Sequence, residues 1–331
     1  MSLLSPIDEG KDYRNDCHAG EQLFNRFLER RSIGFALFYY VVYCFFMIQD
    51  IYPKKLYNEY RPGAVPSEDS LIVSFKENTI LIKENESGED MLFPTLKDIQ
   101  AGKEDLIYLF SVDSQSFFLL QKEIDPPEGY SYQDFRGIRG KDYLSKELVF
   151  AAFTAYQLSE WYTVTRFCGK CGSANENDKI ERARICPKCG NKIYPRINPA
   201  VIIGVTDKES NRIVLTKYRT GFAHNALVAG FTEIGETLEG TVEREVMEEV
   251  GLKVDNIRYY KSQPWGIASD ILTGFFCDVQ GGKDIKMDAS ELKYAEWVSP
   301  EDIVLQPTNY SLTNEMMKLF KEKGYDGTIN Y

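Results

Sequence analysis

A glutamate-rich segment from Gly230 to Leu252, with the sequence GFTEIGETLEGTVEREVMEEVGL, restricts the fold more than any other part of the chain. Thr237 is suited to cap the start of a helix, and Gly251 is suited to end it. Apolar residues recur at every fourth position between them: Leu238, Val242, Val246 and Val250. This spacing predicts a helix with one apolar face packed against a core.

The same helix carries a cluster of carboxylates. Glu245, Glu248 and Glu249 stand at positions i, i+3 and i+4, so they share one face. Crowded carboxylates repel one another unless a cation lies between them, and hard oxygen ligands suit Mg²⁺ or Mn²⁺. Arg244 is placed to orient a carboxylate through a bidentate pair, and Glu236 precedes the helix in a loop. Taken alone, a glutamate-rich helix also fits a solvated surface.

Four of the seven cysteines form a second module, with fourteen residues between two C-x-x-C pairs that are each followed by glycine. The four residues are Cys168, Cys171, Cys186 and Cys189. Glycine permits sharp turns that aim two thiolates at one metal, so the spacing predicts a structural, tetrahedral zinc ribbon. Four reduced thiols and two redox pairs are the alternatives. Cys17, Cys44 and Cys277 have no partner at ligand spacing and are interpreted as core or surface thiols.

The glutamate-rich segment resembles the signature of the Nudix hydrolases, G-x5-E-x7-R-E-U-x-E-E-x-G-U. All nine specified positions match: Gly230, Glu236, Arg244, Glu245, Val246, Glu248, Glu249, Gly251 and Leu252. The order of the modules also resembles the bacterial NADH pyrophosphatase group of this family. These modules are a helix, Arg166-Phe167-Cys168, the cysteine ribbon, Tyr194-Pro195-Arg196, the Nudix box and Ser262-Gln263-Pro264-Trp265.

The resemblance implies an α+β multidomain protein, commonly a homodimer. Its parts would be an N-terminal β-rich domain closed by a helix, a small zinc ribbon and a C-terminal Nudix α/β/α sandwich. We expect these parts at residues 47–165, 166–194 and 195–331, after an extension of uncertain status at residues 1–46.

The activity that the resemblance implies is metal-dependent hydrolysis of the diphosphate bond in NAD(H)-like dinucleotides, giving AMP and nicotinamide mononucleotide. Glu245, Glu248 and Glu249 would bind Mg²⁺ or Mn²⁺, with Arg244 and Glu236 as further catalytic residues. Glu291 matches the position of a downstream metal-binding glutamate, although an exposed glutamate at a helix start fits equally well. The substrate-binding candidates are Phe231, Trp265, Gln263 and Ser262. Phe231 and Trp265 offer aromatic faces to a nucleotide ring, with core packing as the alternative for Phe231.

The sequence departs from the substrate pattern of that group, Ser-Gln-Pro-Trp-Pro-Phe-Pro-x-Ser. Gly266, Ile267 and Ala268 replace Pro-Phe-Pro, and Asp270 stands at the last serine, with Ser269 one place early. A later Ser-Ile-Ala stretch is echoed at 311–313 by Ser-Leu-Thr. These changes weaken the assignment to NADH more than the assignment to diphosphate cleavage. ADP-ribose, dinucleoside polyphosphates and NAD-capped RNA stay open as substrates, and a nucleotide-sensing module without turnover is the non-enzymatic alternative.

Charge restricts the partners of the chain. Lys plus Arg number 39 against 50 Asp plus Glu, a net charge of −11, which argues against a protein that coats nucleic acid. A local patch at the ribbon could still contact an RNA 5′ end: Lys170, Lys188, Lys192 and Arg196. We expect a cytoplasmic enzyme with a small-molecule dinucleotide substrate.

The N-terminal half carries no motif with recognisable chemistry. Ile33–Gln49 is free of charge and follows Arg26, Arg30 and Arg31, which fits a membrane anchor, a buried helix or a leader that precedes a true start at Met47. Beyond it we expect short strands around 71–82 and 107–122, a connection at 125–140 and a helix at 145–164.

Overall fold

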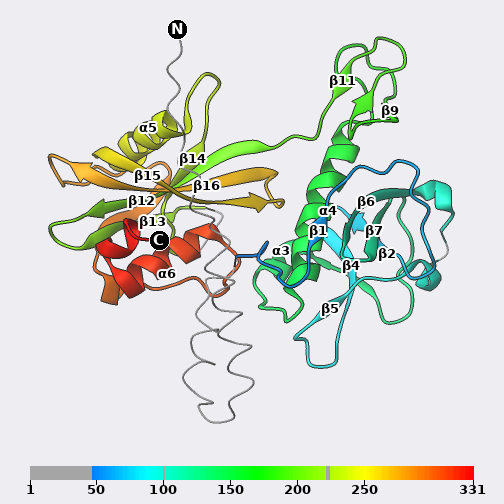
Figure 1. The fold of residues 1–331 in the computed structure, drawn as a ribbon, viewed down its shortest axis with the longest axis horizontal. Helices are drawn as coiled ribbons and strands as arrows, with labels where there is room; N and C mark the ends of the chain where they lie inside the picture. Colours follow the sequence, from blue (N-terminus) through cyan, green and yellow to red (C-terminus); the bar gives the residue numbers. More distant parts are fainter. Residues whose placement is uncertain (1–46, 100, 221–223) are drawn as a thin grey trace, which may run out of the picture. The chain divides into compact units, whose positions relative to one another are not determined.

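The C-terminal part of the chain is built on a mixed sheet around strand β12, which is buried from Ala200 to Asp207 (Figure 1). The computed structural model describes residues 47–99, 101–220 and 224–331. Strand β12 pairs in parallel with β16 and antiparallel with β14 and β13. Across the sheet the order is β15 (Lys253–Trp265), β16 (Asp270–Gln280), β12 (Asn198–Asp207), β13 (Arg212–Tyr218) and β17 (Leu292–Val298), with β14 (Val228–Phe231) also beside β12.

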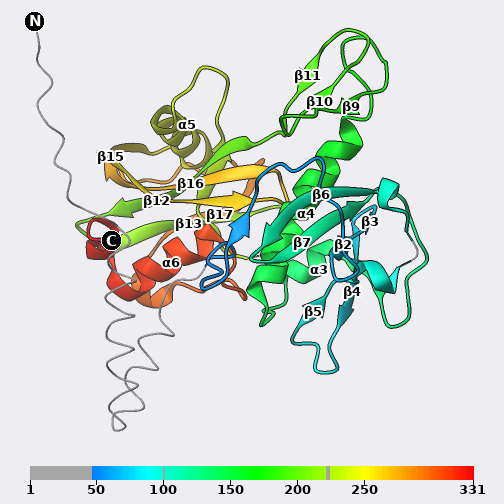
Figure 2. The same ribbon diagram turned by 45° about the vertical axis from the view of Figure 1, so that its right-hand side comes forward.

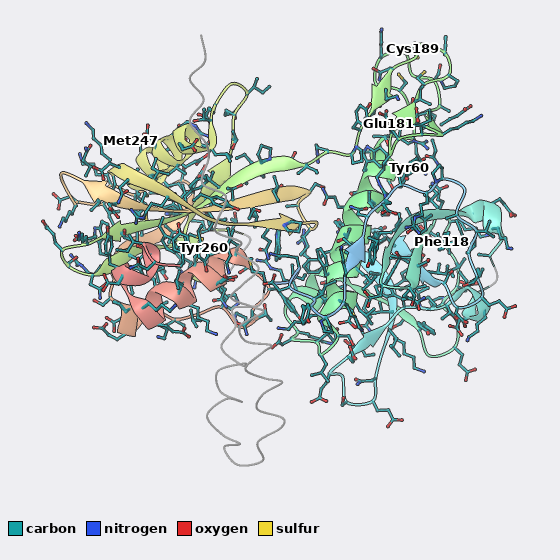
Figure 3. The ribbon with its side chains drawn as sticks, in the orientation of Figure 1. Tyr60, Phe118, Glu181, Cys189, Met247 and Tyr260 are labelled. Atoms are coloured by element: carbon teal, nitrogen blue, oxygen red, sulfur yellow. The ribbon has the colours of Figure 1, made fainter. Side chains whose placement is uncertain are left out.

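Two helices cover opposite faces of this sheet. Helix α5 (Leu238–Val250) packs on β12, β14 and β15, and helix α6 (Leu312–Lys323) packs on β12, β15 and β16 (Figure 2). Met247 on α5 and Tyr260, which donates a hydrogen bond to Glu315 of α6, mark the two sides in Figure 3. The α/β/α sandwich is therefore confirmed.

The predicted Nudix-box helix is confirmed in detail. Thr237 caps α5 by accepting a hydrogen bond from the Gly240 backbone, and Gly251 ends it at a φ of 68°, a conformation that glycine adopts without strain. Val242, Val246 and Val250 are fully buried. Their face of the helix forms one core with the sheet, so the predicted apolar face is confirmed.

The N-terminal part contains two small sheets beside helix α4. One sheet has the order β1 (Leu56–Tyr57), β6 (Leu106–Val112), β7 (Gln115–Leu120) and β2 (Leu71–Val73). The other has β3 (Phe75–Lys76), β4 (Thr79–Glu84) and β5 (Met91–Leu92), with β8 (Ser131–Asp134) paired to β4. Helix α4 (Lys146–Val164) occupies the range predicted for it. Single-turn 3₁₀ helices lie at Leu96–Asp98, Lys103–Asp105, Pro300–Asp302 and Tyr325–Thr328.

The expected connection at 125–140 is wrong in its second half. Strand β8 pairs with β4, and helix α3 (Phe135–Arg139) follows it directly. Phe135 is buried and its ring stacks on Tyr156 at 4.4 Å. Tertiary pairing and packing therefore override the glycines and prolines of this stretch, which had indicated a loop.

The structure describes only the last three residues of the apolar run Ile33–Gln49. Its residues up to Phe46, together with Cys17 and Cys44, lie outside the described residues, so the anchor, buried-helix and alternative-start interpretations stay open. Met47 and Ile48 are buried, and the Ile48 backbone donates a hydrogen bond to Tyr310 O. Within the described part of the chain, no helix combines the length and apolarity needed to cross a bilayer.

Candidate active site and zinc site

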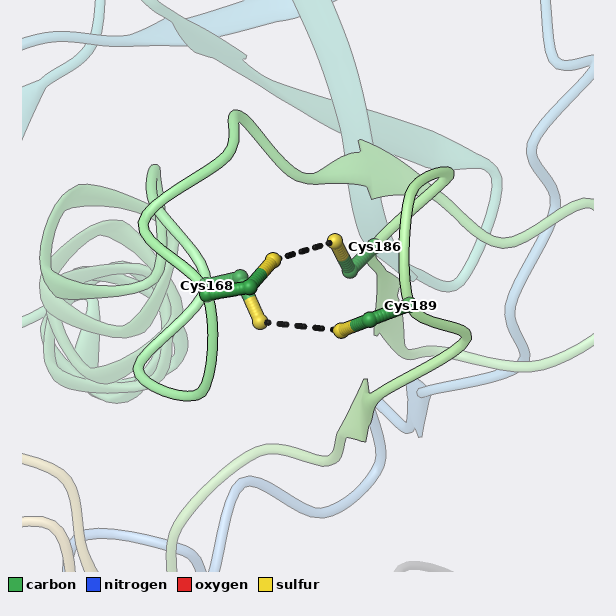
Figure 4. A group of neighbouring side chains, drawn as sticks. Cys168, Cys186 and Cys189 are labelled. Atoms are coloured by element: carbon green, nitrogen blue, oxygen red, sulfur yellow. Dashed lines mark hydrogen bonds between the residues drawn. The ribbon is translucent and has the colours of Figure 1, made fainter.

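The four cysteines of the ribbon gather at one point (Figure 4). Their sulfur atoms lie within 4.8 Å of one another, with 3.7 Å between the Sγ atoms of Cys168 and Cys189 and 3.5 Å between those of Cys171 and Cys186. Tetrahedral zinc with Zn–S bonds of 2.3 Å requires sulfur atoms about 3.8 Å apart. The cluster therefore has the ligand set and the approximate spacing of a zinc site.

Two matching turns position these thiols. The backbone of Cys168 accepts from Gly172 N and donates to Ser173 O, and Cys186 makes the equivalent bonds with Gly190 N and Asn191 O. Both glycines have positive φ, 73° and 70°, so a side chain at either position would strain the turn. The three-stranded sheet β9 (Glu176–Asn177), β10 (Arg184–Ile185) and β11 (Lys192–Ile193) connects the two turns.

In the predicted catalytic site, Arg244 positions the carboxylates of the Nudix box. Its Nε and Nη2 donate to the two oxygens of Glu236 at 2.7 and 3.0 Å. Its Nη1 donates to Glu245 at 2.7 Å and to Glu248 at 2.9 Å. The guanidinium holds the pKa of Glu236 at about 2. Both Glu236 oxygens are thus engaged with Arg244, which places this residue as a support for the arginine.

Glu249 is the buried member of the cluster. Only 3% of the Glu249 surface is exposed. Its Oε1 accepts a hydrogen bond from the Tyr218 hydroxyl at 3.2 Å. Its Oε2 is buried and has no hydrogen-bond partner among the residues that the structure describes. Burial, followed by the charges of Glu245 and Glu291, raises the pKa of Glu249 to about 8. A buried carboxylate oxygen without a donor, next to other carboxylates, is a fitting ligand for a divalent cation.

The glycine that begins the Nudix box, Gly230, is required for steric reasons. A Cβ on Gly230 would lie 2.0 Å from the carboxyl carbon of Glu245, so only glycine lets this carboxylate cross over strand β14. Burial raises the pKa of Glu245, opposed by Arg244. In the described residues the cysteines alone bring three or more ligand atoms within 4.8 Å of one another; Glu245 and Glu248 are each held by Arg244 instead.

Tyr218 was not identified from the sequence. It ends strand β13, where the pairing with β17 shifts register between Lys217 and Tyr218. Such a bulge re-aims a side chain, and here the hydroxyl reaches Glu249. A tyrosine at a strand end carries no local signal of this contact, because the bulge depends on pairing with β17.

Glu291 lies in the turn just before β17, exposed, and not at a helix start. Its charge acts on Glu245, Glu249 and Tyr218. The alternative of a helix-start glutamate is therefore wrong, while its role as a ligand stays a prediction.

The substrate-binding candidates divide between the two sheet faces. Paired residues in adjacent strands project to the same side of a sheet. One such row contains Phe231, Ala200, Leu272 and Gln263. This row faces helix α6, because the backbone N–H of Leu312 donates to Gln263. The neighbouring row places Ser262 on the side of Gly230 and α5. Phe231 is 54% exposed and available for stacking, whereas Gln263 is fully buried and also bonded to Gln49 and Tyr310.

Trp265 is buried rather than open. Its ring meets Phe153 edge-on at 5.6 Å, and the Arg139 guanidinium lies 5.2 Å from its centre. The departure at Gly266 has a structural basis, since a Cβ there would lie 2.1 Å from the Phe153 carbonyl oxygen. Glycine thus lets the β15–β16 turn pack directly on α4, where a proline would clash.

The basic patch proposed at the ribbon is weaker than its composition indicated. Lys192 forms ion pairs with Asp178 at 3.1 Å and Glu181 at 2.7 Å. Lys170, Lys188 and Arg196 are exposed. Of the three remaining cysteines, Cys277 is fully buried in the sheet core, as a core thiol should be.

Comparisons with known proteins identify the two domains that contain these residues. A NADH pyrophosphatase zinc ribbon domain matches residues 165–194, and a NUDIX domain matches residues 196–320. Three curated proteins named NAD-capped RNA hydrolase NudC are similar: one from Enterobacter sp. (40% identity over 53% of this chain and 67% of that protein), one from Shigella dysenteriae (36%, over 56% and 71%) and one from Klebsiella pneumoniae (41%, over 46% and 58%). The chain belongs to the Nudix hydrolase family, in the group that carries the NADH pyrophosphatase zinc ribbon.

Proposed function

We propose that this protein hydrolyses the diphosphate bond of NAD(H)-like dinucleotides and releases AMP and nicotinamide mononucleotide. Water would add to one phosphorus atom while the bridging P–O bond breaks, so that each product leaves with one phosphate group. The observation that carries the proposal is Glu249, whose buried Oε2 has no donor in the described part of the chain and lies among the carboxylates of a complete Nudix box.

Each residue has a proposed role in this reaction. Bound Mg²⁺ or Mn²⁺ would neutralise diphosphate charge and lower the pKa of water. Glu245, Glu248 and Glu249 would hold the metal, with Glu291 as a further ligand. Arg244 would orient Glu245 and Glu248, and Glu236 would fix Arg244. Phe231 would stack on a nucleotide ring, and Ser262 would contact the substrate from the α5 face.

An NAD cap on RNA is the second candidate substrate, because the similar proteins are named for it and it contains the same bond. The homodimer and the cytoplasmic location remain predictions. The cytoplasmic location is supported by the four clustered cysteines, which are free rather than paired in disulfides, since reduced cysteines persist in the cytosol.

The test is hydrolysis of NADH, NAD, ADP-ribose, diadenosine polyphosphates and NAD-capped RNA with Mg²⁺ or Mn²⁺. Cleavage of NAD or NADH to the two mononucleotides supports the proposal. A preference for ADP-ribose or diadenosine polyphosphates would show that one of these, and not NAD(H), is the substrate. Binding without cleavage of any of them would instead assign the chain to the nucleotide sensors.

A further inference from the structure

The junction between the zinc ribbon, helix α4 and strand β6 concentrates buried polar atoms that lack hydrogen-bond partners. Among the described residues, nine buried side-chain nitrogen and oxygen atoms have no partner, and five of them belong to this junction. These five are Tyr108 Oη, Trp161 Nε1, Asn175 Oδ1, Arg182 Nη1 and Arg184 Nε. Tyr108, Trp161 and Asn175 are only 5–7% exposed. Because buried polar groups are normally paired and most of these atoms are donors, the junction has the character of a binding site for an acceptor.

Arg182 connects the ribbon to strand β6. Its Nη2 donates to Leu109 O at 2.6 Å, and its guanidinium also interacts electrostatically with the neighbouring Tyr108. The same guanidinium lies 5.5 Å from the centre of the Tyr60 ring, whose hydroxyl donates to Asp178 O of the ribbon at 2.7 Å (Figure 3). The position of Arg182 is therefore fixed through Nη2, while Nη1 has no acceptor among the described residues.

Arg184, two residues further along the ribbon, reaches the last turns of helix α4. Its Nη2 donates to Asn175 O at 2.7 Å, and its guanidinium lies 6.0 Å from the centre of the Tyr162 ring. Tyr162 packs against Trp161, with ring centres 4.7 Å apart. The charges of Arg182 and Arg184 both act on Tyr162, so the two guanidinium groups lie around one tyrosine.

Neither arginine forms an ion pair with a carboxylate in the described part of the chain. The nearby Asp178 pairs with Lys192 at 3.1 Å instead, and Glu176 influences Arg184 without an ion pair. Burial lowers the pKa of both arginines, because two positive charges are held partly away from water. A buried charge is stabilised by an opposite charge, and guanidinium groups match the oxygen atoms of a phosphate.

A cavity of about 430 Å³ lies beside this group, within the size range of small-ligand sites. Its walls are formed by ribbon residues 177–179, Tyr60, residues 62–64 and the first three residues of β6, which end with Tyr108. Outside the ribbon these walls are apolar or aromatic. Asp178 also lines the cavity, and its Oδ1 accepts from the backbone of residues 180 and 181. The cavity thus has room for an organic group next to the buried Tyr108 hydroxyl.

We propose that this junction binds a phosphate group, with Arg182 and Arg184 as its counter-ions and the Tyr108 hydroxyl as a further contact. The group belongs either to free phosphate or to a small monoester whose organic part occupies the cavity. The ligand ties the ribbon to strand β6, because the arginines come from the ribbon and Tyr108 from the strand. The inference is independent of the proposed hydrolysis, since none of these residues belongs to the carboxylate site.

Binding is measured by calorimetric titration of the full, zinc-loaded chain with inorganic phosphate, without Mg²⁺ or Mn²⁺ and at constant ionic strength. We expect saturable binding in the wild type that weakens about tenfold or more in Arg182→Gln. Tyr108→Phe keeps the ring in the core and should weaken binding about fivefold, and it carries the test if Arg182→Gln fails to fold. Arg136→Gln, which removes an exposed arginine on helix α3, should bind like the wild type. Absence of saturable binding, or equal affinity in the wild type and the folded variants, overturns the proposal.

Phenyl phosphate separates the two sources of the phosphate group. If the ligand is a monoester, phenyl phosphate should bind about tenfold more tightly than inorganic phosphate, because its ring adds apolar contact in the cavity. If the ligand is free phosphate, the ester should bind equally or more weakly. In both cases saturation should slow hydrogen exchange in residues 166–194 of the wild type and leave exchange in Arg182→Gln unchanged. Exchange that saturating phosphate leaves unchanged in the wild type would overturn the tie between the ribbon and strand β6.

Discussion

The zinc ribbon and the carboxylate cluster hold their candidate ligands in different ways. In the ribbon, each pair of thiols is aimed by its own turn, and each turn closes through hydrogen bonds within six residues. In the carboxylate cluster, Glu249 needs Tyr218 from a distant strand and Glu245 needs the bare backbone of Gly230. Arg244 bridges Glu245 and Glu248 through one guanidinium nitrogen. The first site is local and closed. The second depends on the tertiary fold and leaves Oε2 of Glu249 without a partner among the described residues.

The largest effect should come from breaking the closed site. Replacing Cys186 by serine removes one thiolate from a four-ligand shell, and structural zinc binding is worth about 10–16 kcal/mol in zinc-finger peptides. We expect loss of the one zinc ion per chain and unfolding of residues 166–194, measured by metal analysis and hydrogen exchange. Lys188→Ser, an exposed change inside the same turn, should keep the zinc. Full zinc content in Cys186→Ser would contradict the four-thiolate site.

The carboxylate site should respond in activity rather than in folding. Glu249→Gln keeps the shape of the side chain and removes its charge, so we expect a loss of about 10²–10³-fold in kcat/KM. Glu243→Gln, an exposed glutamate on the same helix, should stay close to wild type. The measurement is NAD hydrolysis at saturating Mg²⁺, with circular dichroism to show that both variants fold. Full activity of Glu249→Gln would remove this residue from the metal site.

The pH dependence of stability should report on the burial of Glu249. Glu249 has a pKa of about 8 in the folded chain, above the usual 4.5, because burial disfavours its charge. The folded state therefore binds more protons than the unfolded state between these values, and stability without Mg²⁺ or Mn²⁺ should fall as pH rises from about 4.5 to 8.

Thermal unfolding from pH 5 to 8.5, with zinc retained, checks this dependence. Glu249→Gln should flatten the decline, and added Mg²⁺ should oppose it in the wild type. A wild-type decline that the variant reproduces would have to come from other groups.

The difference between the sites also explains what the sequence could predict. The helix of the Nudix box, its cap at Thr237, its end at Gly251 and the cysteine cluster all follow from spacing within a short segment. Tyr218 could not be found that way, because a bulge against β17 turns it toward Glu249. Gln263 matched a motif as a substrate contact, yet the fold buries it in hydrogen bonds to Tyr310 and Leu312.

The N-terminal part shows the same limit. The helix at 145–164 was predicted from periodicity over many residues, and the structure places α4 there. For strand β8 and helix α3 the sequence predicts a connection instead, because prolines and glycines dominate that stretch. Strand β8 forms by pairing with β4, and helix α3 is held by the ring of Phe135, which contacts Tyr156 and Phe153. Neither interaction can be recognised from the sequence of that stretch alone.

The smallest predicted effect tests whether Glu249 depends on its distant support. Tyr218→Phe removes the hydroxyl that donates to Oε1 and leaves the ring in place, at a cost of about 1–1.5 kcal/mol for one hydrogen bond. We expect Mn²⁺ binding to weaken about five- to tenfold, measured by electron paramagnetic resonance without substrate. Tyr294→Phe, which loses a hydroxyl elsewhere on the sheet, should leave Mn²⁺ affinity unchanged. Equal affinity in Tyr218→Phe and wild type would mean that the helix alone fixes Glu249, and the carboxylate site would then be as local as the ribbon.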